Sequence, residues 1–353
     1  MSSNTCFDRA SRLAAIDRAL DALSAHNREC LLCPRDCGVD RDAGETGFCG
    51  IGPRATVASA LLHFGEEPVL SGVAEVRGFR PGTGDARRGS GTVFFTGCSL
   101  QCLFCQNHQI SRAREQNPAA DDELAAAFLG LQRRGALNLN LVTPSHVLMP
   151  ILRALRIAVA AGFRLPVVYN CGGYEKADVL RFLEGIVDIW LPDLKYHDPG
   201  PAGELSRAPD YFRWASEAVV EMYCQQPRLE TAEDGSARRG LIVRHLVLPG
   251  GEKDSIRILE WMAHRLSPTV GLSLMSQFRP CFRTPPAYDR NVGREEYRAV
   301  LDAARRLGFE TIFAQPEPFA PDEHLVPDFS REKPFDWGAD DDPSGKEDPE
   351  EGS

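Results

Sequence analysis

Three cysteines lie close together in the stretch 97–107, where Cys98, Cys102 and Cys105 are spaced C-x3-C-x2-C. Three thiols within eight positions can converge on one face of a loop. No fourth cysteine follows nearby, whereas ferredoxin clusters and structural zinc sites usually use four protein ligands. Three thiolates on a four-iron cluster leave one iron open, and an open metal position indicates chemistry rather than scaffolding. The alternative interpretations are a zinc site and a disulfide cluster.

A second cysteine group precedes this one, with the spacing C-x2-C-x3-C-x11-C at Cys30, Cys33, Cys37 and Cys49. Four thiolates are the number that a closed tetrahedral zinc site or a second four-iron cluster requires. Several glycines in the same stretch supply the sharp turns of a small metal-stapled loop. We therefore predict a second metal here, with zinc and iron–sulfur both open.

Composition limits the class of protein. The 353 residues are enough for one large or two modest domains, and 43% of them are hydrophobic. The net charge is −10, of which the segment 331–353 carries −6, so the rest of the chain is nearly balanced and nucleic-acid binding is not expected. The polar N-terminus and the lack of a long apolar run predict a cytoplasmic protein that has no membrane partner. Eleven cysteines in a reducing compartment indicate metal binding or catalysis rather than disulfides.

The elements that must position these cysteines alternate between strands and helices. An amphipathic helix is predicted over 7–27, and Gly162 and Gly308 lie where helix C-caps are expected. The alternation predicts an α/β fold with a parallel sheet covered by helices, either a barrel or an open sheet. The predicted strands are 93–95, 139–142, 166–169, 187–190, 241–248, 270–274 and 310–313, and the predicted helices that lie among them are 123–134, 147–161, 176–183, 210–223, 255–266 and 295–307.

Further motifs follow the same order as the elements. They are His63-Phe-Gly-Glu-Glu-Pro68, Asn138-Leu-Asn-Leu-Val-Thr-Pro-Ser-His146, Pro166-Val-Val-Tyr-Asn-Cys-Gly-Gly-Tyr174, Val187-Asp-Ile-Trp-Leu-Pro-Asp-Leu-Lys195 and Arg244-His-Leu-Val-Leu-Pro-Gly250. With the C-x3-C-x2-C cluster, they make the chain from residue 30 to about 320 resemble the radical SAM superfamily, in the branch similar to pyruvate formate-lyase activating enzyme.

The resemblance implies a fold and a division of the chain. The fold would be a partial (β/α)6 radical SAM barrel with the cluster at the carboxyl-terminal mouth of its strands. Residues 1–85 would form an N-terminal helix and a cysteine-rich metal-binding extension, and residues 86–325 the core barrel. The acidic residues 326–353 would form a disordered tail, because they are too polar to bury a core.

The resemblance also implies residues that bind the cosubstrate. Relatives carry Gly-Gly-Glu for the methionine amino group where this chain has Thr143 to His146, and His146 has the alternative role of a helix-start residue. Asn170 replaces the charged residue of an Asp-Thr-Asn-Gly motif and would hydrogen-bond the ribose or the carboxylate.

Two later motifs add three candidates. Asp193 and Lys195 match the Asp-Leu-Lys of glycyl-radical activating enzymes, and two-residue spacing puts both on one face of a strand end, with a surface salt bridge as the alternative. Arg244 and His245 must face opposite sides of their strand, and the resemblance favours His245 as the inward one.

The implied activity is that of an iron–sulfur oxidoreductase. A 4Fe-4S cluster at Cys98, Cys102 and Cys105 would cleave S-adenosylmethionine reductively to a 5′-deoxyadenosyl radical for hydrogen abstraction, with flavodoxin or ferredoxin as reductant. The substrate stays open between a glycyl-radical enzyme and a small molecule or nucleoside, and no side chain is assigned a catalytic role. A non-catalytic iron–sulfur electron carrier is a third interpretation, but it would need no open iron.

Overall fold

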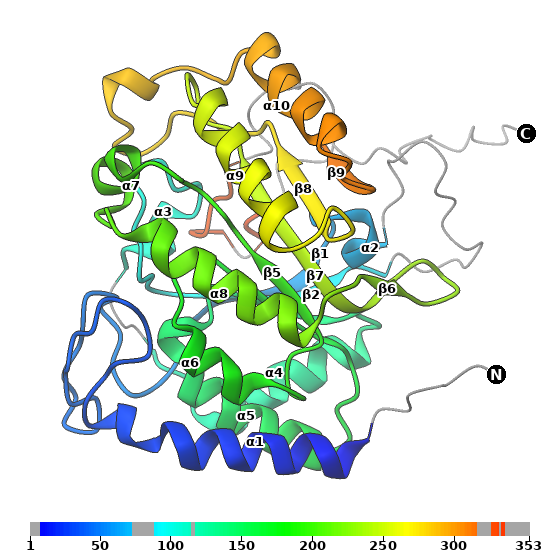
Figure 1. Cartoon of the computed structure of the whole chain (residues 1–353). Coiled ribbons are helices and arrows are strands. Elements are labelled where there is room, and N and C mark those ends of the chain that lie inside the picture. Colours follow the sequence, from blue (N-terminus) through cyan, green and yellow to red (C-terminus); the bar gives the residue numbers. More distant parts are fainter. Residues whose placement is uncertain (1–7, 73–87, 114–116, 316–325, 332, 336–353) are drawn as a thin grey trace, which may run out of the picture.

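The computed structural model describes residues 8–72, 88–113, 117–315, 326–331 and 333–335. Its sheet has the strand order β1-β2-β3-β4-β5-β7-β8-β9, with β6 paired to β7 beside this path (Figure 1). The pairs from β2 to β9 along this path are parallel, and β1 is antiparallel to β2. The strand bounds are β1 Val57–His63, β2 Ser90–Phe95, β3 Leu139–Val142, β4 Val167–Cys171, β5 Ile189–Pro192, β6 Glu230–Thr231, β7 Ala237–Leu246, β8 Gly271–Met275 and β9 Thr311–Ala314.

Helices connect the parallel strands and cover them, as a parallel sheet requires because both of its faces must be shielded from water. All residues of β2, β4 and β5 are buried, which fits strands with helices or chain on both sides. The helix α1 packs against α5, and α5 packs against α4 (Figure 1). The longer helices are α1 Arg9–Leu23, α4 Asp121–Arg133, α5 Leu148–Ala160, α7 Pro199–Ser206, α8 Tyr211–Gln225, α9 Glu252–Arg265 and α10 Arg294–Arg306.

Short helical turns complete the fold. The four-residue helices are α2 Pro68–Ser71, α3 His108–Ser111 and α6 Ala177–Leu180, and the 3-10 turns are Ser24–Asn27, Ser145–Val147, Arg181–Leu183 and Pro286–Tyr288. Among the described helices, none combines the length and the apolar character that crossing a membrane would take.

The predicted α/β architecture is confirmed, and each predicted strand overlaps an observed one. Gly162 and Gly308 end their helices with φ of 97° and 82°, the left-handed conformation expected of helix C-caps. The strand β1 was not predicted, because its sequence Val-Ala-Ser-Ala-Leu-Leu-His does not alternate between apolar and polar residues. The predicted domain boundaries at 85 and 325 fall on residues outside the described part of the chain, as do residues 336–353 of the predicted tail, so these stay predictions.

The N-terminal extension shares its hydrophobic core with the sheet. A single cluster of buried side chains in the described structure contains Ile16 of α1, Cys30 and Ile51 of the cysteine-rich segment, and Phe95 of β2. The extension is therefore packed as part of the same core, so its folding depends on the sheet.

A buried ion pair joins α1 to the sheet. The Arg12 Nη2 lies 2.8 Å from Asp188 Oδ1 and 2.7 Å from Oδ2, and its Nη1 donates to the carbonyl oxygen of Leu165. Burial raises the pKa of Asp188 despite this partner. Asp188 also accepts from the backbone N–H of Val167, so the pair fixes the start of β4 and β5.

Replacing Arg12 by Ala should lower the free energy of unfolding by about 3–5 kcal/mol, because the Asp188 carboxylate, which is only 21% exposed, would lose its cation. Arg156→Ala is the matched control, since Arg156 pairs with Asp17 of α1 but both side chains are about half exposed. That change should cost at most about 1 kcal/mol. Chemical denaturation of both variants measures the difference, and equal losses would contradict the assigned importance of the Arg12 pair.

Candidate functional site

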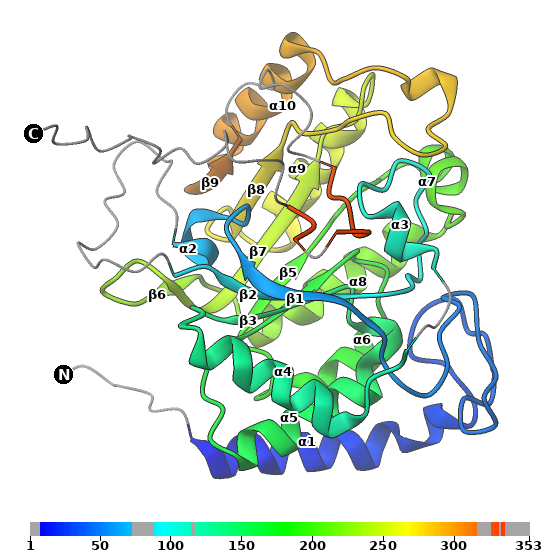
Figure 2. The same ribbon diagram turned by 180° about the vertical axis from the view of Figure 1, so that it is seen from behind.

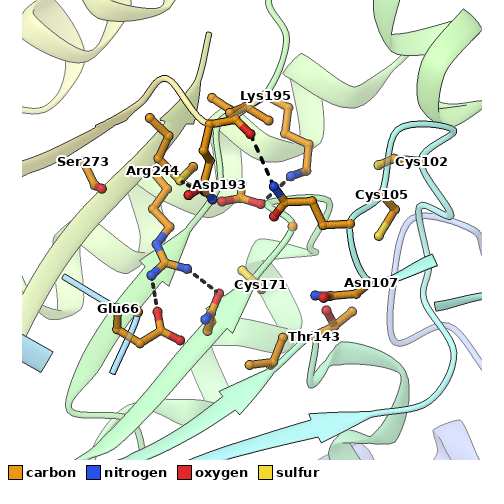
Figure 3. Close-up of a pocket in the computed structure, with 18 of the residues that line it drawn as sticks. Glu66, Cys102, Cys105, Asn107, Thr143, Cys171, Asp193, Lys195, Arg244 and Ser273 are labelled. Carbon is orange, nitrogen blue, oxygen red and sulfur yellow. Dashed lines mark hydrogen bonds and ion pairs between the residues drawn. The ribbon is translucent and has the colours of Figure 1, made fainter. Parts of the chain in front are cut away.

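A cavity of about 430 Å³ lies at the carboxyl ends of the parallel strands (Figure 3). Its volume falls in the range of small-molecule sites, and its position is where ligands bind in parallel α/β folds. Residues at the ends of β2, β3, β4, β5, β7, β8 and β9 contribute to its wall, together with the segment before α2. The lining residues used below are Glu66, Glu67, Cys98, Cys102, Cys105, Thr143, Asn170, Cys171, Asp193, Lys195, Arg244, Pro327 and Phe335.

The three cysteines of the C-x3-C-x2-C motif all line this cavity, at the strand ends where the family resemblance placed them. Their loop starts at Gly97, whose φ is 86° and where a Cβ would lie 2.5 Å from Ile51 Cγ1 and 2.7 Å from the carbonyl oxygen of Cys49. Glycine is thus required for the chain to leave β2 at this angle. Burial, with the neighbouring Cys102 sulfur, raises the pKa of Cys98 to about 12 and that of Cys105 to about 11. These thiols need a bound cation to become thiolates at neutral pH.

Asp193 and Lys195 lie on one face of the chain after β5, as predicted, and both line the cavity. Their side chains form an ion pair and are 21% and 16% exposed, so the alternative of a surface salt bridge does not hold. Burial opposes the charge on Lys195, but the Asp193 carboxylate outweighs it and raises the lysine pKa. Lys195 therefore stays cationic next to the cysteine loop.

Tyr211 and Gly173 fix the backbone on either side of this pair. The Tyr211 hydroxyl accepts from the Lys195 N–H at 3.0 Å and lies 2.8 Å from the Gly172 carbonyl oxygen. At Gly173, with φ of 80°, a Cβ would lie 2.1 Å from the carbonyl oxygen of Asp193. This close approach holds the loop after β4 against the Asp193 backbone.

Thr143 and Asn170 also line the cavity, as predicted. Thr143 has φ of 57°, an uncommon conformation for a β-branched residue, and its N–H donates to the Asn170 carbonyl oxygen at 2.7 Å. The Asn170 side-chain oxygen lies 3.4 Å from Arg244 Nη1. A hydroxyl and an amide therefore face the same space as Lys195.

The prediction that His146 binds the cosubstrate is wrong, because its side chain points under the cysteine loop instead of into the cavity. Its Nε2 lies 2.7 Å from the Thr96 carbonyl oxygen. Burial lowers the pKa of His146 to about 4, so the ring is neutral and donates this hydrogen bond. His146 thus supports the residue before Gly97, which is the structural role that its position at a helix start allowed.

The prediction that His245 faces the cavity is also wrong, because Arg244, its neighbour on β7, is the one that faces inward. His245 Nδ1 lies 2.6 Å from the Leu194 carbonyl oxygen, and its Nε2 lies 2.8 Å from the Ser255 hydroxyl in the first turn of α9. Burial lowers its pKa. Arg244 faces the cavity instead (Figure 3).

Arg244 forms a buried ion cluster that sequence reasoning missed. Its Nε lies 2.7 Å from Glu67 Oε1, and its Nη2 pairs with both Glu67 and Glu66. His63 Nδ1 lies 3.3 Å from Glu66 Oε1, and Asn140 donates to the same oxygen. Burial opposes ionisation of Glu66, but Arg244 and His63 outweigh it and lower its pKa to about 2. The motif at 63–68 contained both carboxylates, but their partner lies almost 180 residues away.

The four N-terminal cysteines do not form a single-ion site. Arg41 lies between two of them, with its Nε 3.3 Å from Cys30 Sγ and its Nη2 3.4 Å from Cys49 Sγ. Cys37 Sγ instead accepts from the Phe48 N–H at 3.3 Å. Among the described residues, no group of three or more His, Cys, Asp or Glu side chains is arranged to hold one metal ion. The second metal therefore stays a prediction, with zinc and iron–sulfur both open.

The residues 326–331 and 333–335 lie over the cavity, although they were predicted as part of a disordered tail. Pro327 and Phe335 line the cavity, and the centre of the Phe335 ring lies 4.4 Å from that of His63 and 5.3 Å from that of Phe94. The Phe329 N–H donates to Gln109 of α3, and this segment (red) runs beside α3 in Figure 2. Apolar residues at the start of the predicted tail thus have a packed position.

A buried carboxyl group lies behind the wall that β4 forms. Glu175 is 3% exposed and accepts hydrogen bonds from the hydroxyls of Ser145 and Tyr169. In the described structure no basic side chain forms an ion pair with it. Burial therefore raises the pKa of Glu175 to about 7.

Comparison with known proteins gives distant relatives. No family model matches the chain. The uncharacterized protein MJ0674 of Methanocaldococcus jannaschii is 27% identical over 298 residues, which cover 81% of this chain and 77% of that protein. Two solved structures of anSMEcpe with bound AdoMet are similar over 62% of this chain, one native with a TM-score of 0.42 and 11% identity, the other carrying a histidine tag with 0.43 and 12%. The chain covers 61% and 58% of those two chains, and the likeness assigns no activity to it.

Glu175→Gln should remove a pH dependence of stability. The folded-state pKa of about 7 exceeds the ordinary 4.5, so this group stabilises the fold fully below pH 4.5 and loses that contribution as the pH rises to about 7. Relative to Glu175→Gln, the wild-type free energy of unfolding should fall by about 2–4 kcal/mol between pH 4.5 and pH 8. Denaturant unfolding at several pH values measures this. Glu217→Gln, at an exposed position of α8, should keep the wild-type profile; a similar profile in Glu175→Gln would contradict the assignment.

Proposed function

We propose that the chain is a radical S-adenosylmethionine enzyme that holds a 4Fe-4S cluster at Cys98, Cys102 and Cys105. The observation that supports this most strongly is the placement of all three cysteines on one loop, facing a cavity at the carboxyl ends of parallel strands. Cys171 also lines the cavity but comes from β4, apart from the loop that carries Cys102 and Cys105 (Figure 3). One iron would therefore be left without a ligand from this loop.

The residues present fit such a cluster. The three cysteines come from one loop and line the same cavity. In a four-iron cluster each thiolate binds a different iron, so the sulfurs need to be spread apart rather than converge on one point. When bound with S-adenosylmethionine, the cluster supplies the electron that cleaves the sulfonium and yields a 5′-deoxyadenosyl radical for hydrogen abstraction.

The side chains around the cavity would bind and orient the cosubstrate. Lys195 offers a cation to its carboxylate, and Asp193 holds that cation in place. The Thr143 hydroxyl and the Asn170 amide offer hydrogen bonds to its polar groups. Burial of this wall excludes water from the reacting groups.

Two classes of substrate are candidates for the hydrogen abstraction. The resemblance to activating enzymes supports a backbone glycine of a glycyl-radical enzyme, with flavodoxin or ferredoxin as the electron donor. The position of Phe335 favours a second candidate, a small molecule or nucleoside, because Pro327 and Phe335 line the cavity and a protein segment would have to pass them to enter it. An electron carrier would need neither the cavity nor the buried Asp193–Lys195 pair.

Anaerobically reconstituted protein should cleave S-adenosylmethionine to 5′-deoxyadenosine when dithionite is added, measured by chromatography after long incubation. The variant with Cys98, Cys102 and Cys105 all changed to Ala should lose this activity and the iron of this site. Iron remaining in that variant would support an iron–sulfur site at the N-terminal cysteines. A wild-type protein that holds its full cluster but forms no 5′-deoxyadenosine, with or without candidate substrates, would refute the proposal.

Lys195→Ala should weaken S-adenosylmethionine binding by about ten- to hundred-fold, because a charge-assisted hydrogen bond contributes about 1.5–3 kcal/mol. Asp193→Asn should weaken binding in the same direction, because it removes the charge that holds the lysine. Calorimetry on cluster-loaded protein measures both, and cluster absorbance should stay unchanged. Lys253→Ala, at an exposed position of α9, is the control. Wild-type affinity in both cavity variants would show that this pair does not contact the cosubstrate.

A further inference from the structure

A chain of buried hydroxyl groups ends at one of the three cavity cysteines. Ser206 Oγ lies 3.0 Å from Cys102 Sγ, and Tyr196 Oη lies 2.7 Å from Ser206 Oγ. Ser206 and Tyr196 are fully buried, and Cys102 is 7% exposed. Because bulk water does not reach these groups, the hydrogen bonds among the three are fixed by the fold.

The cysteine-rich N-terminal segment holds this serine in place. Arg35, which lies between Cys33 and Cys37, donates from Nη2 to the Ser206 carbonyl oxygen at 2.9 Å and from Nε to the Ser99 carbonyl oxygen at 2.7 Å. Its guanidinium lies 4.0 Å from the centre of the Phe48 ring. The Arg35 side chain therefore connects the end of α7 to the loop that carries the cysteines.

The direction of the hydrogen bonds follows from the chemistry of the Cys102 sulfur. A thiolate bound to iron can only accept, so Ser206 must donate to Cys102, and its oxygen is then free to accept from Tyr196. A hydrogen bond to a cluster sulfur stabilises negative charge there. Because the reduced cluster carries more negative charge than the oxidised one, such a bond raises the reduction potential.

We infer that Ser206 is a positioning residue for Cys102. The Ser206 hydroxyl, oriented by Tyr196, donates to the Cys102 sulfur and thereby raises the reduction potential of the proposed cluster. This inference rests on the proposed function, because it requires the cluster at Cys98, Cys102 and Cys105. It assigns to Arg35 the task of holding Ser206 at hydrogen-bonding distance. The cysteine-rich segment thereby affects the electron-transfer step through a backbone contact, whether or not it holds a metal itself.

The test is an anaerobic redox titration of reconstituted protein followed by electron paramagnetic resonance, with iron content measured in parallel. Ser206→Ala should keep the wild-type iron content, while its midpoint potential becomes more negative. At a fixed potential, the ratio of reduced to oxidised cluster should fall by about three- to tenfold, where tenfold corresponds to about 59 mV for one electron. Ser24→Ala, at an exposed position in the turn after α1, should leave the potential unchanged.

Tyr196→Phe gives a second, independent test, because it keeps the Ser206 donor but removes the Tyr196 hydroxyl that orients it. Its potential should shift in the same direction by a smaller amount. An unchanged potential in Ser206→Ala overturns the inference while leaving the proposed function intact, whereas a wild-type protein that binds no cluster refutes the proposed function itself. If Ser206→Ala does not hold iron, Tyr196→Phe decides, and an unchanged potential in that variant overturns the inference.

Discussion

The carboxyl ends of the parallel strands all lie at the same edge of the sheet, and the position of the cavity depends on this constraint. A parallel strand must return through a helix before it can pair again, so every strand delivers its last residues to the same edge. Cys98 follows β2, Thr143 follows β3, Asp193 follows β5, and Arg244 lies near the end of β7. Residues separated by up to about 150 positions therefore line one space, and none of them needs a long loop to reach it.

Each of the described carboxylates that line this space has a partner of opposite sign. Glu66 and Glu67 share Arg244, and Asp193 pairs with Lys195. Removing one partner of such a group would leave an uncompensated charge, which costs more than the pair itself contributes. Glu175 has hydroxyl partners instead of a cation, and burial therefore raises its pKa to about 7. Each of these groups is thus held by partners within the protein.

The cysteine-rich N-terminal segment supports the cavity from outside. Its arginines donate to backbone carbonyl groups near the cysteine loop, Arg35 to Ser99 and Arg41 to His146. Its backbone also packs against Gly97, where only a glycine fits. Two of its thiols contact Arg41, so a guanidinium lies between Cys30 and Cys49 in this structure. Cysteine spacing alone does not predict this contact, because it does not show which side chain lies between the sulfurs.

The sequence by itself determined the β/α order, the cysteine loop at a strand end, and the common face of Asp193 and Lys195, because each depends only on local spacing and periodicity. Only the tertiary structure decided that Arg244 rather than His245 faces the cavity, since period-two alternation places two neighbours on opposite sides without saying which side is inside. It also decided that His146 supports Thr96, that Glu66 meets Arg244, and that Ser206 meets Cys102. Those contacts join residues 50 to 178 positions apart, and their partners are chosen by how helices and strands pack, which no local pattern in the chain encodes.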